Sequence, residues 1–181
     1  MAKKSGLQLT TVRLAHIHFF YIFAFVASII VYDASLLIAP DAVLRRWKMA
    51  VAMAIVVTGV WYFARIKKDS PLFQKWLIAL LVFMDIIFAS FLVYADRGMA
   101  SLAVALYGVP IIVAGTLSSR SAVLATASLC TASYAFVAVK YFVDYFNEGY
   151  KVQLYGTIGF YGAVFFILAL LLVTVIRRKE N

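Results

Sequence analysis

The chain alternates between long apolar runs and short polar turns. A membrane-spanning helix needs about 20 mainly apolar residues, and six stretches meet this requirement: residues 16–38, 49–65, 76–95, 99–117, 121–143 and 154–176. Apolar residues fill these runs continuously, without the three- and four-residue spacing of a surface helix in a soluble protein. The loops between them are too short to hold a folded domain. The pattern predicts an all-α polytopic membrane protein built as a six-helix transmembrane bundle.

The same pattern divides the chain into three parts. Residues 1–15 precede the first span, residues 16–176 form the transmembrane domain, and residues 177–181 form a polar tail. The first part has amphipathic character and either lies along the inner membrane surface or is a disordered start. The first apolar run is too long for the core of a cleavable signal peptide. The tail is either the end of the protein or a junction to a cytoplasmic signalling domain.

Composition excludes a soluble protein. The 181 residues are 65% hydrophobic and 14% charged, and the mean hydropathy is +0.96, whereas soluble domains are about 45–50% apolar. The net charge of +9 does not indicate a nucleic-acid partner, because the basic residues gather at the ends of the apolar runs. Lysine and arginine in such positions bind anionic lipid headgroups. Membrane lipids are therefore expected partners.

The distribution of basic residues also predicts the orientation. Cytoplasmic loops carry an excess of lysine and arginine. With both termini inside, eleven of these residues lie on the cytoplasmic side and six outside. The group Arg45–Lys48 is an exception on the outer side. The prediction is a multi-pass protein of the bacterial inner membrane with both termini cytoplasmic.

The third and fourth spans contain the most informative polar residue. Asp85 lies at the midpoint of the third span, the turn Asp96–Gly98 follows that span, and Pro110 interrupts the fourth. A charge inside an apolar span costs at least about 2.5 kcal/mol and normally faces a bundle interior or an aqueous cavity. Asp85 could bind a cation, relay protons or anchor a ligand. Alternatively, it could simply hydrogen-bond a neighbouring helix. Pro110 is expected to kink the fourth helix.

Two further charged residues lie late in their spans. Asp33 in the first span and Lys140 in the fifth are both expected near the outer face. They could pair with each other as part of a ligand or ion site. Lys140 could equally extend to the headgroups, burying only its aliphatic stem.

The sequence offers no pattern for a metal, a cofactor or catalysis. His16 and His18 diverge by about 200° around a helix, so they cannot ligate one metal or haem together. Cys130 is the single cysteine, and no hydrolytic triad, phosphate loop or zinc motif is present. We expect no enzyme activity, no metal and no cofactor in this chain.

Small residues in the last two spans indicate close helix packing. Gly156, Gly159 and Gly162 open the sixth span, and the fifth is rich in alanine and serine. Small residues let helix backbones approach closely in a membrane. The glycines therefore form either a packing face within one bundle or the face of a homodimer.

Residues 80–141 resemble a known family. The matching residues are Asp85 in the third span, Gly98 and Ser101 after it, the run Leu106–Ala114 with Tyr107 and Pro110, the turn Ser119-Arg120, and Ala125–Ala127 with Tyr134 in the fifth span. This arrangement resembles the N-terminal six-helix sensor region of bacterial histidine kinases of the pilus-regulator type. Two departures are Arg97-Gly98 in place of a double glycine and Ser101-Leu102 in place of Ser-Pro. Such kinases continue into a dimerisation helix and an ATP-binding domain.

The resemblance implies a membrane-embedded sensory input module of a two-component histidine kinase. A small molecule, a lipid or a membrane protein would contact a cavity around Asp85, Tyr107 and Pro110, and the sixth helix would relay the change. Two alternatives come from other classes. One is a small transporter or channel with Asp85 as its ion or proton site, and the other is a structural subunit of a membrane complex.

Overall fold

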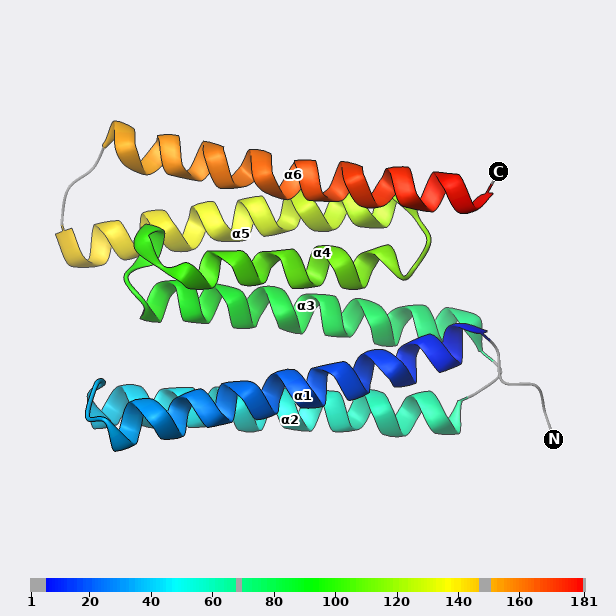
Figure 1. Ribbon diagram of the computed structural model, residues 1–181, viewed down its shortest axis with the longest axis horizontal. Helices are drawn as coiled ribbons and strands as arrows, with labels where there is room; N and C mark the ends of the chain where they lie inside the picture. The colour runs from blue at the N-terminus through cyan, green and yellow to red at the C-terminus, as the bar shows by residue number, and fades with distance from the viewer. Residues whose placement is uncertain (1–5, 68–69, 147–150, 181) are drawn as a thin grey trace. The chain divides into compact units, whose positions relative to one another are not determined.

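The computed structural model describes residues 6–67, 70–146 and 151–180, and within these ranges every regular element is a helix (Figure 1). The six α-helices are α1 (Gly6–Ala34), α2 (Pro40–Ile66), α3 (Pro71–Ala95), α4 (Gly108–Gly115), α5 (Arg120–Phe146) and α6 (Val152–Glu180). Two 3₁₀ helices, η1 (Gly98–Ala100) and η2 (Leu102–Tyr107), precede α4. The predicted all-α, six-helix architecture is confirmed. Residues 1–5 of the predicted N-terminal segment and Asn181 of the predicted tail lie outside the described residues.

Several helices begin at residues suited to a helix start. Pro40 and Pro71 open α2 and α3, where the missing N–H of proline removes no intrahelical bond. The hydroxyl oxygen of Ser70 accepts a hydrogen bond from the backbone N–H of Phe73 at 3.3 Å. Before α5, the hydroxyl oxygen of Ser119 accepts a hydrogen bond from the backbone N–H of Ala122 at 3.4 Å. These caps satisfy amide groups that have no partner within their own helix.

Five helices are long and apolar enough to cross a membrane, namely α1, α2, α3, α5 and α6. Helices α2, α3, α5 and α6 include the predicted spans 49–65, 76–95, 121–143 and 154–176, whereas α1 ends at Ala34, four residues before the predicted end of the first span. In α1 the helix begins at Gly6 and continues without a break through residue 16. The predicted border between an N-terminal segment and the first span therefore falls inside one helix.

The fourth predicted span has a different form from the one expected. Residues 99–117 do not make one kinked helix but are divided between η1, η2 and α4. The apolar stretch Leu102–Gly115 is shorter than the other spanning helices. Counting about 2.0 Å per 3₁₀ residue and 1.5 Å per α residue, it covers about 24 Å. The hydrocarbon core is about 30 Å thick.

The position of Pro110 explains this difference. Pro110 is the third residue of α4, where an amide has no intrahelical partner, so its missing N–H breaks no bond. A continuous α-helix would instead place the ring of Pro110 against the carbonyl of Leu106, four residues earlier. The chain avoids that clash by keeping 3₁₀ geometry up to Tyr107. The break thus precedes the proline and does not kink a helix at it.

The chain forms two compact units that divide within α3, after Leu81. In the first unit α1 and α2 pack side by side in opposite directions (Figure 1). Their buried faces include Ile22 and Phe25 of α1 and Met53 and Val57 of α2. The side-chain amides of Gln8 and Gln74 both donate to the carbonyl of Ala64, each at 3.2 Å.

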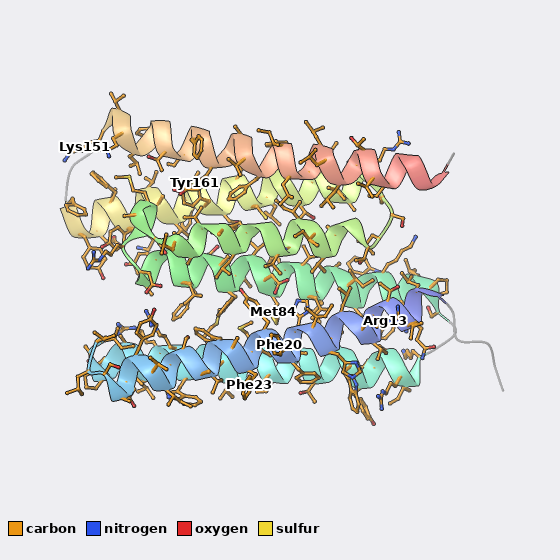
Figure 2. The ribbon with its side chains drawn as sticks, in the orientation of Figure 1. Arg13, Phe20, Phe23, Met84, Lys151 and Tyr161 are labelled. Carbon is orange, nitrogen blue, oxygen red and sulfur yellow. The ribbon has the colours of Figure 1, made fainter. Side chains whose placement is uncertain are left out.

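The second unit contains the C-terminal part of α3 with η1, η2, α4, α5 and α6. Helices α5 and α6 are antiparallel neighbours, and α4 packs against both (Figure 1). Tyr161 projects from α6 toward α5 (Figure 2), where its ring centroid lies 5.5 Å from that of Tyr134. At the start of η1, Arg97 and Gly98 both have positive φ. The tight turn predicted at Asp96–Gly98 is therefore present.

Candidate functional site

Tyr107 lies at the junction between η2 and α4 and contacts three other helices. Its side chain is fully buried. The hydroxyl groups of Tyr107 and Ser90 of α3 are 2.8 Å apart, and Ser90 also donates to the carbonyl of Ile86 at 2.7 Å. Because Ser90 gives its proton to Ile86, its oxygen is the acceptor for the Tyr107 hydroxyl. The thiol of Cys130 in α5 contacts the carbonyl oxygen of Tyr107 at 3.6 Å.

The ring of Tyr107 belongs to an aromatic cluster of Tyr107, Tyr134, Tyr161 and Phe165. The ring of Tyr107 lies 6.0 Å from that of Tyr134 and 5.5 Å from that of Phe165. Tyr134 is also 6.3 Å from Phe165. Tilted and edge-on pairs at these separations are favourable beyond the area they bury. The cluster joins α5 and α6 to the start of α4.

Within the aromatic cluster, the hydroxyl group of Tyr134 lies at a position where its burial costs free energy. Its side chain is fully buried, and its hydroxyl has no hydrogen-bond partner among the described residues. Burying a hydroxyl without a partner costs about 1–3 kcal/mol in proteins. An arrangement that gives this hydroxyl a partner would therefore gain free energy.

The predicted site residues Asp85, Tyr107 and Pro110 are all buried in the second unit. The Asp85 side chain is only 2% exposed and interacts electrostatically with the thiol of Cys130. Cys130 therefore interacts with both Asp85 and Tyr107. The sequence prediction did not include Cys130, because a single cysteine gives no pattern.

A groove of about 470 Å³ lies on the second unit between α3 and α5. Its walls are mainly apolar and include Ile86, Leu129, Phe136 and Val137, and Ser90 and Ser133 contribute polar atoms. Ser90 thus faces the groove while it holds the hydroxyl of Tyr107. The groove itself was not predicted, since it arises from the packing of two helices that are distant in the sequence.

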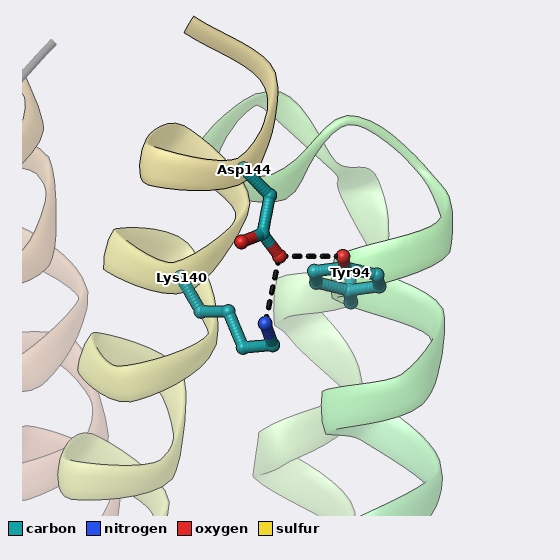
Figure 3. A network of polar contacts seen from close by, with 3 residues as sticks. All are labelled: Tyr94, Lys140 and Asp144. Carbon is teal, nitrogen blue, oxygen red and sulfur yellow. Dashed lines mark hydrogen bonds and ion pairs between the residues drawn. The ribbon is translucent and has the colours of Figure 1, made fainter. Parts of the chain in front are cut away.

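A polar network lies near the ends of α3 and α5 (Figure 3). The carboxylate of Asp144 accepts hydrogen bonds from the ammonium group of Lys140 and the hydroxyl of Tyr94, both at 2.8 Å. Lys140 was a predicted site residue and Asp144 was not, although their i, i+4 spacing is a known pairing distance on a helix. The suggested Asp33–Lys140 pair would join the two units and stays a prediction.

The three glycines at the start of α6 differ in their surroundings. A Cβ added at Gly162 would lie 2.9 Å from the methyl carbon of Thr131 in α5, so this glycine packs within the bundle. At Gly156 and Gly159 an added Cβ would meet nothing within 4 Å. The homodimer face at these two positions stays a prediction.

The two histidines make separate contacts within the first unit. His18 is buried, and its Nδ1 lies 2.8 Å from the carbonyl oxygen of Leu14. His16 accepts a hydrogen bond from the indole of Trp61 at 3.2 Å. No group of three or more histidine, cysteine, aspartate or glutamate residues that could hold a metal occurs in the described part of the chain.

One comparison with known proteins gave a match. A family model described as a PilS-like transmembrane domain matches residues 3–181, which is almost the whole chain. Searches of curated proteins and of solved structures gave no match.

Proposed function

Because the chain belongs to the PilS-like transmembrane domain family, we propose that it is the sensory input module of a two-component histidine kinase. The chain is a multi-pass membrane protein. In the proposed setting it lies in the bacterial inner membrane with both termini in the cytoplasm. A small molecule, lipid or membrane protein is sensed, and a histidine kinase region carries out the phosphorylation.

The observation that carries this proposal is the set of contacts around Tyr107. One residue joins α3 through Ser90, α5 through Cys130 and Tyr134, and α6 through Phe165. A stimulus that moves α3 relative to η2 therefore changes contacts on α6 as well. The α-helical geometry of α6 continues to Glu180, so a change in its position reaches the cytoplasmic side.

The proposed mechanism is a population shift between two arrangements of the second unit. A stimulus shifts the two populations only if it binds one arrangement more tightly than the other. Tyr134 takes part in this shift, because its buried hydroxyl lacks a hydrogen-bond partner in the described structure. In the second arrangement this hydroxyl gains a partner. Asp85 supplies a buried carboxyl group whose surroundings differ between the two arrangements.

A chimera tests the proposal directly. The full chain is fused through the end of α6 to the cytoplasmic region of a known histidine kinase and reconstituted in lipid vesicles. Asp85→Asn is expected to change autophosphorylation about fivefold or more, the lower range of typical coupling between sites. Asp41→Asn, at the exposed start of α2, is the matched control and should leave the rate unchanged. Equal rates for Asp85→Asn and the parent chimera would contradict the proposed role of Asp85.

The native polypeptide gives a second test. An antibody against residues 66–75 is used to immunoblot source cells. A band well above 20.2 kDa would show that this chain is part of a larger protein and would favour the kinase proposal. A band at 20.2 kDa would contradict the kinase proposal and favour transport or a structural role in a membrane complex.

A further inference from the structure

We propose that the groove between α3 and α5 binds one acyl chain of a phospholipid whose phosphate contacts Lys140. This lipid site stands on the geometry of the groove and does not depend on the signalling role.

The groove lies where lipid is the surrounding solvent. It is formed by the middle parts of two membrane-spanning helices. Phe83 and Phe136 stand at its rim and are 54% and 69% exposed. Its volume of about 470 Å³ is within the range of small-molecule sites in proteins. An open apolar groove at this depth is filled by hydrocarbon.

The lining and extent of the groove suit an acyl chain. The lining residues of α5 run from Leu129 to Val137, a length of about 12 Å at 1.5 Å per residue. Apart from Ser90 and Ser133, all of the lining residues are apolar. A hydrocarbon chain about 4–5 Å wide, given carbon contact distances of 3.5–4.0 Å, can lie along such a groove.

The length of the groove matches one leaflet of the bilayer. The lining residues Leu129, Ser133 and Phe136 continue at helical spacing to Lys140 on the same face of α5. From Leu129 to Lys140 the helix rises about 16 Å. Half of a hydrocarbon core of about 30 Å is about 15 Å. A lipid whose phosphate lies at Lys140 therefore extends its acyl chain to the far end of the groove.

Lys140 has donors left for a phosphate. Its side chain is 51% exposed, and the structure gives its ammonium group a bond to Asp144. Tyr94 donates to the same carboxylate oxygen, so Asp144 is shared between two donors. A lysine ammonium has three N–H groups. The network of Figure 3 thus holds Lys140 at the end of the groove with donors that can reach a lipid phosphate.

Native mass spectrometry of the purified full chain tests this proposal. The probe is dioleoyl phosphatidylglycerol added to the protein in detergent, and the expected result is one retained lipid per chain. Ala132→Phe fills the groove and is expected to abolish this adduct. Ala125→Phe adds the same ring to an exposed position of α5 outside the groove, and this variant should retain the lipid adduct.

The contact with the phosphate is tested by removing the charge of Lys140. Lys140→Gln should weaken lipid binding about fivefold, the effect of one lysine near the surface. Lys48→Gln should leave it unchanged.

A second measurement keeps the test valid if Ala132→Phe fails to fold. A phosphatidylglycerol with a photoreactive diazirine in its acyl chain is reacted with the wild-type protein in vesicles. Labelling should concentrate on the peptide containing Leu129 and Phe136. Uniform labelling of all apolar helices would overturn the proposal, and so would equal lipid retention by Ala132→Phe and Ala125→Phe. Crosslinks from the groove to another protein in place of lipid would also overturn it. None of these results depends on kinase output.

Discussion

The hydroxyl oxygen of Ser90 lies 2.8 Å from that of Tyr107, and this bond connects the groove on α3 and α5 to the aromatic cluster. Ser90 lines the groove, whereas Tyr107 is fully buried against Phe165 of α6. Anything that displaces Ser90 therefore removes the hydrogen-bond partner of Tyr107. Through this bond, a side chain that lines the groove is connected to a side chain that contacts α6.

Replacing Tyr107 by phenylalanine should lower stability modestly and change signalling strongly. The ring contacts remain, so the loss is one interhelical hydrogen bond, which averages about 0.6 kcal/mol in membrane proteins and reaches about 1.7. We expect a small decrease in the thermal unfolding midpoint in detergent. In the kinase chimera the autophosphorylation rate should change about fivefold or more. Tyr145→Phe, at an exposed position of α5, should alter neither quantity.

The helices could be predicted from the sequence because continuous apolar runs determine membrane spans. The site could be predicted only in part. Asp85 was identified because a charge within an apolar run is unusual, Pro110 because it interrupts an apolar span, and Tyr107 from the family resemblance. Ser90 was missed, since a serine in an apolar helix is unremarkable until its neighbours are known. The 3₁₀ geometry of η2 was also missed, because it depends on a steric clash that Pro110 would make.

Replacing Gly98 by alanine should destabilise the second unit. Gly98 has φ +61°, and an added Cβ would lie 2.5 Å from Cδ1 of Tyr141. Backbone strain of this kind alone costs about 1–3 kcal/mol. We expect a clear decrease in the thermal unfolding midpoint, with partial recovery in the double variant Gly98→Ala, Tyr141→Ala. Gly59→Ala is the control, because its Cβ would meet nothing within 4 Å, and it should stabilise α2 by up to about 1 kcal/mol. Full recovery in the double variant would mean that the positive φ itself costs nothing.

Gln74 should be important for the connection between α2 and α3. Its side-chain amide donates to the carbonyls of Ala64 at 3.2 Å and Lys67 at 2.9 Å, at the end of α2. Gln74→Ala removes both bonds, so we expect a loss of about 1–3 kcal/mol in stability. The measurement is thermal unfolding in detergent. Lys75→Ala alters the neighbouring exposed residue and should have little effect. If both variants unfold alike, the two bonds do not stabilise the connection.

The glycines of α6 separate the two packing hypotheses. Gly162→Leu should disrupt the bundle, because even a Cβ at this position would lie 2.9 Å from Thr131. Gly156→Leu and Gly159→Leu have space for their side chains in a single chain. If these two glycines form a homodimer face, the leucine variants should keep the thermal unfolding midpoint but reduce crosslinking between copies in vesicles. Unchanged crosslinking would mean that any contact between two copies uses a surface other than the one formed by Gly156 and Gly159.

The transport alternative is tested by proton flux and by Asp85. A buried carboxylate within a span is also the residue type of a proton relay, and Asp85 is 2% exposed in α3. We expect vesicles containing the full chain to hold an imposed pH gradient as well as empty vesicles do. A pH-sensitive dye inside the vesicles measures the decay of the gradient. Faster decay that Asp85→Asn abolishes would establish transport, because a signalling carboxylate needs no continuous path to both sides. Faster decay that Asp85→Asn leaves unchanged would indicate leak and would leave the sensor proposal standing.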